Sequence, residues 1–148
     1  MLSYVKGDLF QNIPKQKCIL PHIVNSVGLW GSGFVIPLGH HYSEARRIYI
    51  NTPKANLVLG EVQLAIVDNV TIVNMIAQKG IGSQNGPPIR YEALVKCMSW
   101  IRLYCNIKHI DRIIAPKFGS QRAGGRWEFI EILIKEIWGE FDVTIFEL

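Results

Sequence analysis

The segment from Asn25 to Val35 (NSVGLWGSGFV) combines residue types that suit the binding of an anion. Three of its glycines, at positions 28, 31 and 33, surround one large aromatic residue, Trp30. Glycine accepts a positive φ and lets the backbone approach another molecule closely. Backbone N–H groups in such a loop, between a strand and a helix, can hold a phosphate. A tight strand-to-helix connection with Trp30 as a packing residue explains the pattern equally well.

The glycine spacing matches neither the Gly-x-x-x-x-Gly-Lys-Ser/Thr loop nor the Rossmann fingerprint, so an anion held here is bound in another manner. Near the loop, His22 lies in the apolar run Cys18–Val24, and a histidine with a pKa of about 6.5 can transfer a proton. A lone histidine in a buried strand is more often a hydrogen-bonded core residue. Asp8 follows Gly7 at a turn; the pattern favours a capping role over contact with an exocyclic amine of a ligand.

A second glycine-rich segment, Lys117 to Arg126 (KFGSQRAGGR), follows the apolar run 112–116 and precedes a helical pattern at 127–139. The order of strand, glycine loop and helix therefore occurs twice. In open α/β sheets such loops meet at the carboxyl ends of neighbouring strands, where ligands bind. The segment 78–88 (QKGIGSQNGPP) is rich in structure breakers, and we expect a mobile functional loop there.

The elements that must position these loops follow from hydrophobic periodicity. The apolar runs 57–67 and 70–77, joined by Asp68 and Asn69, predict an antiparallel hairpin. Together with the other patterns they predict the fold class α/β, a three-layer α/β/α sandwich on a mixed six-stranded sheet. The predicted strands are 3–6, 18–24, 57–67, 70–77, 112–116 and 141–148, and the predicted helices are 34–51, 91–106 and 127–139.

Composition limits the class of protein. The 148 residues, 49% of them hydrophobic, predict a single domain spanning 1–148. No apolar run approaches the length of about 18 residues that a membrane span needs, and the first residues lack signal-peptide features, so we expect a cytoplasmic protein. The spacing of three cysteines and four histidines predicts neither disulfides nor a metal site, and we expect no cofactor. The net charge of +4 is scattered, which favours a small phosphate-bearing ligand over nucleic acid.

In combination, these segments resemble the macrodomain family over nearly the whole chain, and especially its small single-domain branch with the yeast-type ADP-ribose-1″-phosphate phosphatase and the terminal ADP-ribose protein glycohydrolase. The residues that carry the resemblance are Tyr4 to Phe10 (YVKGDLF), His22-x-x-Asn25, Gly28-x-Trp30-Gly-Ser-Gly33, Asn74 to Gln78 (NMIAQ), Pro88 to Leu94 (PIRYEAL), Pro116 to Ser120 (PKFGS), Ala123-Gly-Gly-x-Trp127 and Val143 to Leu148 (VTIFEL).

The resemblance implies a cleft for ADP-ribose. In that cleft Asp8 and the backbone of Leu9 would contact the adenine, Asn25 would contact the distal ribose, and the two glycine loops would hold the diphosphate. The implied ligand-binding residues are Gly7, Asp8, Leu9, Ile23, Val24, Asn25, Trp30, Gly31, Ser32, Gly33, Phe34, Val35, Gln78, Lys117, Phe118, Gly119, Ser120, Gln121, Arg122, Ala123, Gly124, Phe146 and Leu148.

The glycohydrolase relatives use a catalytic lysine and an aspartate that this chain lacks at the matching positions. Gln78 stands where the lysine is expected, with Lys79 one residue out of phase on a strand, and Ala123 replaces the aspartate. Gln121 and Arg122 also depart from the family's pattern in the second loop. The remaining catalytic candidates are His22 and Asn25.

Three functions are compatible with these residues, and we expect the first, with the second as its alternative. The first is a hydrolase that removes a phosphate or acyl group from the terminal ribose of ADP-ribose, and the second is a non-catalytic module that binds ADP-ribose or an ADP-ribosylated protein. Both need the same cleft and differ only in proton transfer at the distal ribose. The third is a surface that binds RNA or poly(ADP-ribose), which the scattered charge favours least. We expect a monomer.

Overall fold

The computed structural model describes residues 1–81, 86–120 and 123–148. These residues form six strands and four α-helices, with two short 3-10 helices, η1 (Leu9–Gln11) and η2 (Lys54–Asn56). The strands and α-helices are β1 (Leu2–Lys6), β2 (Cys18–Asn25), α1 (Val35–His41), α2 (Ser43–Ile50), β3 (Val62–Val67), β4 (Val70–Gln78), α3 (Tyr91–Lys108), β5 (Arg112–Pro116), α4 (Trp127–Ile137) and β6 (Asp142–Glu147).

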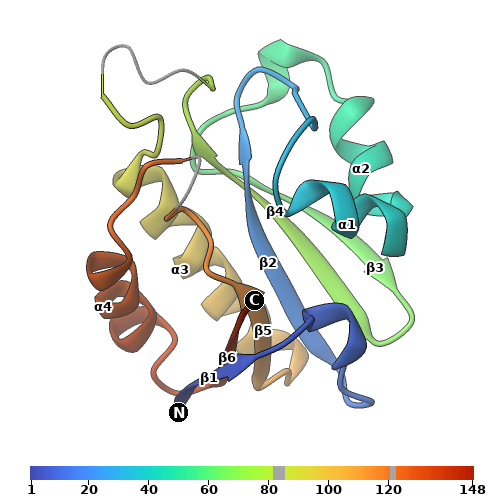
Figure 1. Ribbon diagram of the computed structural model, residues 1–148, viewed down its shortest axis with the longest axis vertical. Coiled ribbons are helices and arrows are strands. Elements are labelled where there is room, and N and C mark those ends of the chain that lie inside the picture. Colours follow the sequence, from blue (N-terminus) through green and yellow to red (C-terminus); the bar gives the residue numbers. More distant parts are fainter. Residues whose placement is uncertain (82–85, 121–122) are drawn as a thin grey trace.

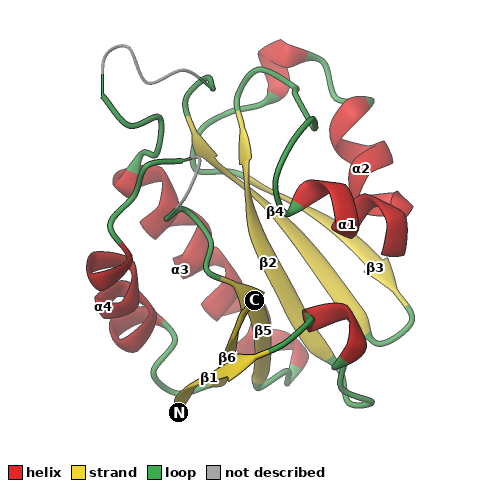
Figure 2. Ribbon diagram, in the orientation of Figure 1, coloured by secondary structure: helices red, strands yellow, loops and turns green. Residues whose placement is uncertain are grey.

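The strands form one sheet in the order β1-β6-β5-β2-β4-β3. Neighbouring strands are parallel except β3 and β4, which form the antiparallel hairpin that the sequence predicts. Helices α1 and α2 cover one face of the sheet, and α3 and α4 cover the other (Figures 1 and 2). The predicted three-layer α/β/α fold with a mixed six-stranded sheet is therefore confirmed.

Each face of the sheet has its own apolar core, because successive side chains of a strand point to opposite faces. In β2, Cys18 and Leu20 pack with the residues of α1 and α2, whereas Ile19 packs with those of α3 and α4. Strands β2 and β4 are buried along nearly their whole length. Continuous apolar runs are typical of parallel strands that helices cover on both faces.

Two predicted elements differ clearly from the observed ones, whereas the ends of the others agree to within two residues. The helical pattern at 34–51 forms two helices, because the backbone of Tyr42 (φ −136°, ψ 76°) leaves the helical region between α1 and α2. The strand predicted at 57–67 begins only at Val62, since η2 and a turn at Gly60 (φ +94°) come first. No helix in the described part of the chain is long and apolar enough to span a membrane.

This topology gathers the predicted functional loops at one edge. Because β2, β4, β5 and β6 run parallel, their carboxyl ends lie together. The first glycine loop leaves β2 there, and the second leaves β5. The sheet order places β2 and β5 next to each other, so the two loops face one another across this edge.

Candidate functional site

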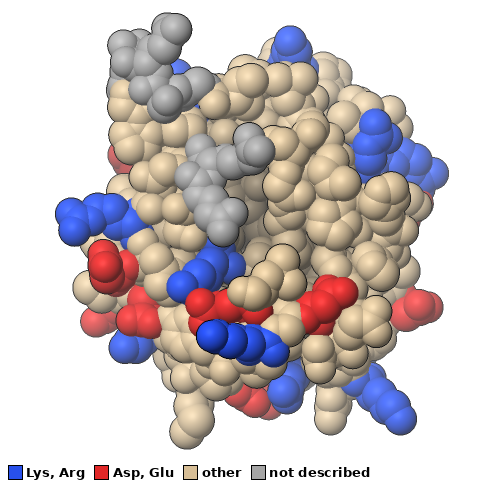
Figure 3. All heavy atoms as spheres, in the orientation of Figure 1, with Lys and Arg blue, Asp and Glu red and all other residues tan. Residues whose placement is uncertain are grey.

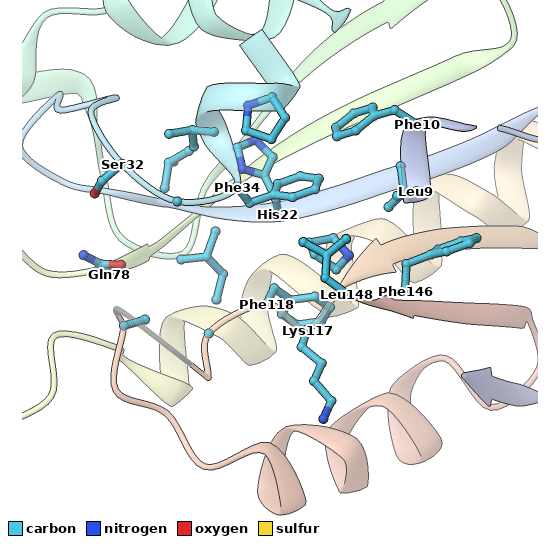
Figure 4. A pocket seen from close by; sticks show the side chains of 18 of the residues that line it. Leu9, Phe10, His22, Ser32, Phe34, Gln78, Lys117, Phe118, Phe146 and Leu148 are labelled. Carbon is cyan, nitrogen blue, oxygen red and sulfur yellow. The ribbon is translucent and has the colours of Figure 1, made fainter. Parts of the chain in front are cut away.

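A cavity of about 1220 Å³ lies at the carboxyl ends of the strands, between the two glycine loops. Its walls come from the ends of β2, β4, β5 and β6, from both loops and from α1. Figure 4 shows aromatic and apolar side chains at one end of the cavity, among them Leu9, Phe10 and Phe146, and the polar side chains of Ser32 and Gln78 at the other end.

Most residues that the sequence predicts for the site line this cavity. They are Gly7, Asp8, Leu9, His22, Ile23, Val24, Asn25, Gly31, Ser32, Gly33, Phe34, Val35, Gln78, Lys117, Phe118, Gly119, Ala123, Phe146 and Leu148. Trp30, Ser120 and Gly124 do not line it. Gln121 and Arg122, and the part of the predicted mobile loop at 82–85, lie outside the described residues.

Trp30 belongs to the core instead of the cavity wall. It is buried against His22 and against Tyr49 of α2. Its indole nitrogen lies over Gly39, where a β-carbon would come within 3.0 Å of Nε1. The alternative interpretation of Trp30 as a packing residue therefore describes this side chain, while the loop around it lines the cavity.

The side chain of Asn25 organises the first glycine loop. Its Oδ1 accepts hydrogen bonds from the backbone N–H groups of Val27 (3.0 Å) and Leu29 (3.2 Å), and its Nδ2 donates to the backbone oxygen of Leu29 (2.7 Å). The hydroxyl group of Tyr49 also donates to Oδ1 (2.7 Å). With respect to the described residues, one amide hydrogen of Asn25 remains for a ligand.

His22 lines the cavity from the centre of β2 but is only 2% exposed. Its Nε2 lies 2.5 Å from Oδ1 of Asn74 on β4, whereas its Nδ1 has no hydrogen-bond partner among the described residues. Burial lowers the pKa of His22 to about 4, and the hydrogen bond to Asn74 opposes this shift only in part. The imidazole is therefore neutral at neutral pH.

The second glycine loop closes on itself. Gly119 has a φ of +80°, and its backbone oxygen accepts a hydrogen bond from the backbone N–H of Gly125 (2.7 Å). The hydroxyl group of Ser120 donates to the backbone oxygen of Lys117 (3.1 Å), so it caps this turn instead of facing the cavity. Gly124 packs closely against Pro87, since a β-carbon at Gly124 would lie 2.8 Å from Cβ of Pro87.

Three charged side chains, Asp8, Lys117 and Glu147, belong to the described cavity wall. Nζ of Lys117 forms an ion pair with Glu147 (2.9 Å) and lies 5.8 Å from the centre of the Trp127 ring. Asp8 caps η1, because its Oδ1 accepts from the backbone N–H of Phe10 (3.0 Å), and it also lines the cavity. Over the visible face, Lys and Arg side chains are dispersed and form no single stripe (Figure 3).

The structure places Gln78 and Lys79 as strand alternation predicts. Gln78 lines the cavity, and its Nε2 donates to the backbone oxygen of Gly80 (3.0 Å). Lys79 is exposed and is not among the lining residues. Ala123 lies in the wall, buried to 5% exposure. The charged or imidazole side chains in the described wall are thus Asp8, His22, His41, Lys117 and Glu147.

Sequence reasoning missed seven lining residues: Phe10, Leu29, Pro37, His41, Ile81, Pro116 and Glu147. Three aromatic rings form a column here, with Phe10 stacked on His41 (4.4 Å between ring centres, 4° between planes) and on Phe34 (5.5 Å). Phe34 and His41 are seven residues apart at α1, a spacing that puts two side chains on one helix face. That spacing was the available signal. Within the described ranges, no group of three His, Cys, Asp or Glu residues could hold a metal ion.

No protein-family model and no curated protein matches the chain. Among solved structures, a protein of unknown function from Bacteroides thetaiotaomicron is 35% identical, with a TM-score of 0.90 over 100% of this chain and 98% of that one. A macrodomain protein from Streptomyces coelicolor is 26% identical, with a TM-score of 0.80 over 100% of this chain and 99% of that one.

A further similar structure is DarTG from Thermosipho africanus in complex with ADP-ribose. It is 18% identical, with a TM-score of 0.78 over 98% of this chain and 41% of that one, and so it shows a shared fold. The fold, the two facing glycine loops and these likenesses establish the class. The chain belongs to the macrodomain family.

Proposed function

We propose that the cavity binds ADP-ribose or an ADP-ribosyl group on a protein. The observation that carries this proposal is the placement of two glycine loops on opposite sides of one elongated cavity whose ends differ in chemistry. Backbone N–H groups in such loops can hold a diphosphate without a cation at each oxygen. The ADP-ribose in the structurally similar Thermosipho DarTG supports the choice of ligand.

The apolar end fits the adenine. Phe146, Leu9 and the Phe10–Phe34–His41 column offer aromatic and apolar surface, on which a planar base can stack. Asp8 uses Oδ1 to cap η1, so Oδ2 remains to accept a hydrogen bond from an exocyclic amine. The two interpretations of Asp8 are therefore compatible, because one carboxylate can serve both roles.

The polar end fits the distal ribose. Asn25 has one amide hydrogen to donate, and Ser32 and Gln78 lie at the same end of the cavity (Figure 4). The polar groups there and the apolar surface at the other end give the ligand a direction along the cleft. The diphosphate would then lie between the loops around Gly31 and Gly119.

Hydrolysis at the terminal ribose is the second candidate function. The observation in its favour is His22, which lines the cavity and whose buried Nδ1 has no hydrogen-bond partner among the described residues. With a pKa of about 4, this imidazole is a weak general base at neutral pH. Gln78 and Ala123 supply neither a nucleophile nor a carboxylate. Binding is therefore the function that the geometry supports better.

Isothermal calorimetry with ADP-ribose, AMP and ADP tests the proposal. We expect ADP-ribose to bind with micromolar affinity and AMP to bind much more weakly. The affinity for ADP-ribose should fall little between about 50 and 200 mM salt. A steep salt dependence would favour the surface for RNA or poly(ADP-ribose), and no heat with any ligand would refute the cleft's assignment. Turnover of ADP-ribose-1″-phosphate, lost in His22→Ala, would establish the hydrolase.

A further inference from the structure

A directional chain of hydrogen bonds runs from helix α2 to His22. The hydroxyl group of Thr52 donates to the backbone oxygen of Ile48 (2.7 Å), and Nε2 of Gln63 donates to Oγ1 of Thr52 (2.9 Å). Oε1 of Gln63 in turn accepts from Nδ2 of Asn74 (3.2 Å). A backbone carbonyl can only accept, so it sets the direction of every bond that follows.

The last bond of this chain determines which nitrogen of His22 carries the proton. Nδ2 of Asn74 donates to Gln63 and also to the backbone oxygen of Ala45 (3.1 Å), which fixes the orientation of the amide. Oδ1 of Asn74 therefore faces Nε2 of His22, and Nε2 must be the donor. A neutral imidazole has one donor and one acceptor nitrogen, so Nδ1 is left as an acceptor.

Nδ1 is buried and has no hydrogen-bond partner among the residues that the structure describes. A buried acceptor that lacks a hydrogen bond is costly to leave unsatisfied, and such exceptions call for an explanation. His22 lines the cavity, with its ring next to Phe34 (5.9 Å between ring centres; Figure 4). The ring is part of the cavity wall, but Nδ1 itself has almost no exposed surface, so contact with a ligand requires a small shift of the ring or of Phe34.

We propose that the chain through Asn74 holds His22 as the Nε2–H tautomer and that Nδ1 accepts a hydrogen bond from a hydroxyl group of the ligand. Asn74 is then a positioning residue, and His22 is a determinant of specificity. The inference rests on the proposed function, because ADP-ribose brings ribose hydroxyl groups into the cavity. A phosphate ester at the same hydroxyl would bring acceptor oxygens against the lone pair of Nδ1, so this position selects a free hydroxyl group.

The surroundings keep the acceptor available over the physiological pH range. The ring is packed between Asn74 of β4 and two aromatic residues of the first loop, Trp30 and Phe34. Burial is the main cause that lowers the pKa of His22, and no charged side chain in the described part of the chain contributes to the shift. Protonation of Nδ1 would convert the acceptor into a donor and remove the proposed interaction.

The first test uses the unaltered protein and ¹⁵N NMR of its imidazole groups, which distinguishes protonated from unprotonated ring nitrogens. At neutral pH we expect His22 to carry its proton on Nε2 and to have an unprotonated Nδ1. Adding ADP-ribose should shift the Nδ1 resonance in the direction of hydrogen-bond acceptance. A proton on Nδ1 in the free protein, or an unmoved Nδ1 resonance when ADP-ribose is bound, would overturn the inference.

The second test changes the positioning residue. In Asn74→Asp a carboxylate still accepts from Nε2 but stabilises the imidazolium ion, which raises the pKa of His22. Affinity for ADP-ribose should then weaken by about tenfold for each pH unit below the new pKa and recover above it, whereas that of the unaltered protein stays flat between about pH 6 and 8. A pH-independent affinity in a folded Asn74→Asp variant would contradict the role of Asn74.

Asn69→Asp is the matched control. Nδ2 of Asn69 donates to the backbone oxygens of Pro14 and Gln16, and Asn69 does not line the cavity. The affinity of the Asn69→Asp variant for ADP-ribose should therefore stay independent of pH. The failures are distinguishable. If no ADP-ribose binds, the proposed function fails while the tautomer can still be measured; if ADP-ribose binds without a response at Nδ1, only the present inference fails.

Discussion

The hydroxyl oxygen of Tyr49 lies 2.6 Å from the backbone oxygen of Asn25 and 2.7 Å from its Oδ1, so its single hydrogen is shared between two acceptors of one residue. The same oxygen accepts a hydrogen bond from the backbone N–H of Gly28 (3.2 Å). Tyr49 belongs to α2 and is fully buried. This contact ties a helix on one face of the sheet to the first turn of the glycine loop.

Removing that hydroxyl group should loosen the loop. We expect Tyr49→Phe to lower the free energy of unfolding by about 1 kcal/mol and to weaken ADP-ribose binding several-fold, because the loop loses its attachment to α2. Urea unfolding and calorimetry measure the two effects. Tyr104→Phe is a suitable control, since Tyr104 stacks on Trp100 in α3 and does not line the cavity. Unchanged affinity in Tyr49→Phe would show that the loop holds its shape without α2.

Two glycines of the loops should respond differently to alanine. A β-carbon at Gly125 would lie 2.4 Å from the backbone oxygen of Gly119, the acceptor that closes the second loop. We expect Gly125→Ala to lower the free energy of unfolding by about 1–3 kcal/mol. A β-carbon at Gly31 meets no described atom within 4 Å. Gly31→Ala should therefore keep its stability to within about 0.5 kcal/mol and still lose affinity, since it lines the cavity.

Urea unfolding and calorimetry on both alanine variants decide this prediction. Equal stability of the two would contradict the close approach of Gly125 to Gly119. Undiminished affinity of Gly31→Ala would mean that the ligand does not come close to the backbone of the first loop.

The buried imidazole predicts how stability depends on pH. In the unfolded chain His22 binds a proton below about pH 6.5, whereas in the folded chain it does so only below about 4. Between these values the unfolded state binds more protons, so the free energy of unfolding rises with pH. The stabilising contribution of the neutral imidazole is fully present above about pH 6.5. The contribution of His22 reaches about 3 kcal/mol.

Urea unfolding between about pH 4.5 and 7.5 checks the sign. The unaltered protein should lose more stability on acidification than His22→Gln, which lacks the titrating group. Parallel pH profiles for the two proteins would show that the pKa of His22 in the folded chain is close to its ordinary value.

The ion pair between Lys117 and Glu147 should affect binding more than folding. Both side chains are partly exposed, and the stability cost of Lys117→Met should stay below about 1 kcal/mol. The same change leaves the carboxylate of Glu147 uncompensated on the cavity wall, where it repels a diphosphate. We expect several-fold weaker ADP-ribose binding, reduced further at low salt.

Calorimetry on the double variant separates charge from shape. Adding Glu147→Gln to Lys117→Met should restore most of the affinity, because no uncompensated charge remains. If the double variant binds as weakly as Lys117→Met, Lys117 contacts the ligand directly instead of neutralising Glu147.

The sequence was sufficient to predict the sheet and much of the cavity wall, because both depend on short-range patterns. Continued alternation past the end of β4 places Gln78 toward the cavity and Lys79 toward solvent without any knowledge of packing. Likewise, the glycine loops had to lie at the carboxyl edge once the strands were parallel. The fold class and these positions therefore follow from periodicity and turn chemistry.

The rest depends on tertiary packing that no local pattern encodes. Trp30 sits inside a glycine loop, yet its side chain turns into the core, since space over Gly39 accommodates the indole. Phe10 and His41 are 31 residues apart and become neighbours only when η1 meets α1. The donor and acceptor roles around His22 required partners from β3, β4 and α2, which the sequence does not indicate as neighbours.

The pairing of β1 with β6 connects the cleft to the two ends of the chain. Among the described strands β1 pairs with β6 alone, from Leu2 opposite Val143 to Lys6 opposite Glu147, so it is connected to the rest of the sheet only through β6. Closing such a long loop is entropically costly and slow. Gly7 and Asp8 directly follow β1, and Phe146 lies in β6. The apolar end of the cleft is thus complete only when the two ends of the chain have paired, and the proposed affinity for a nucleotide depends on that pairing.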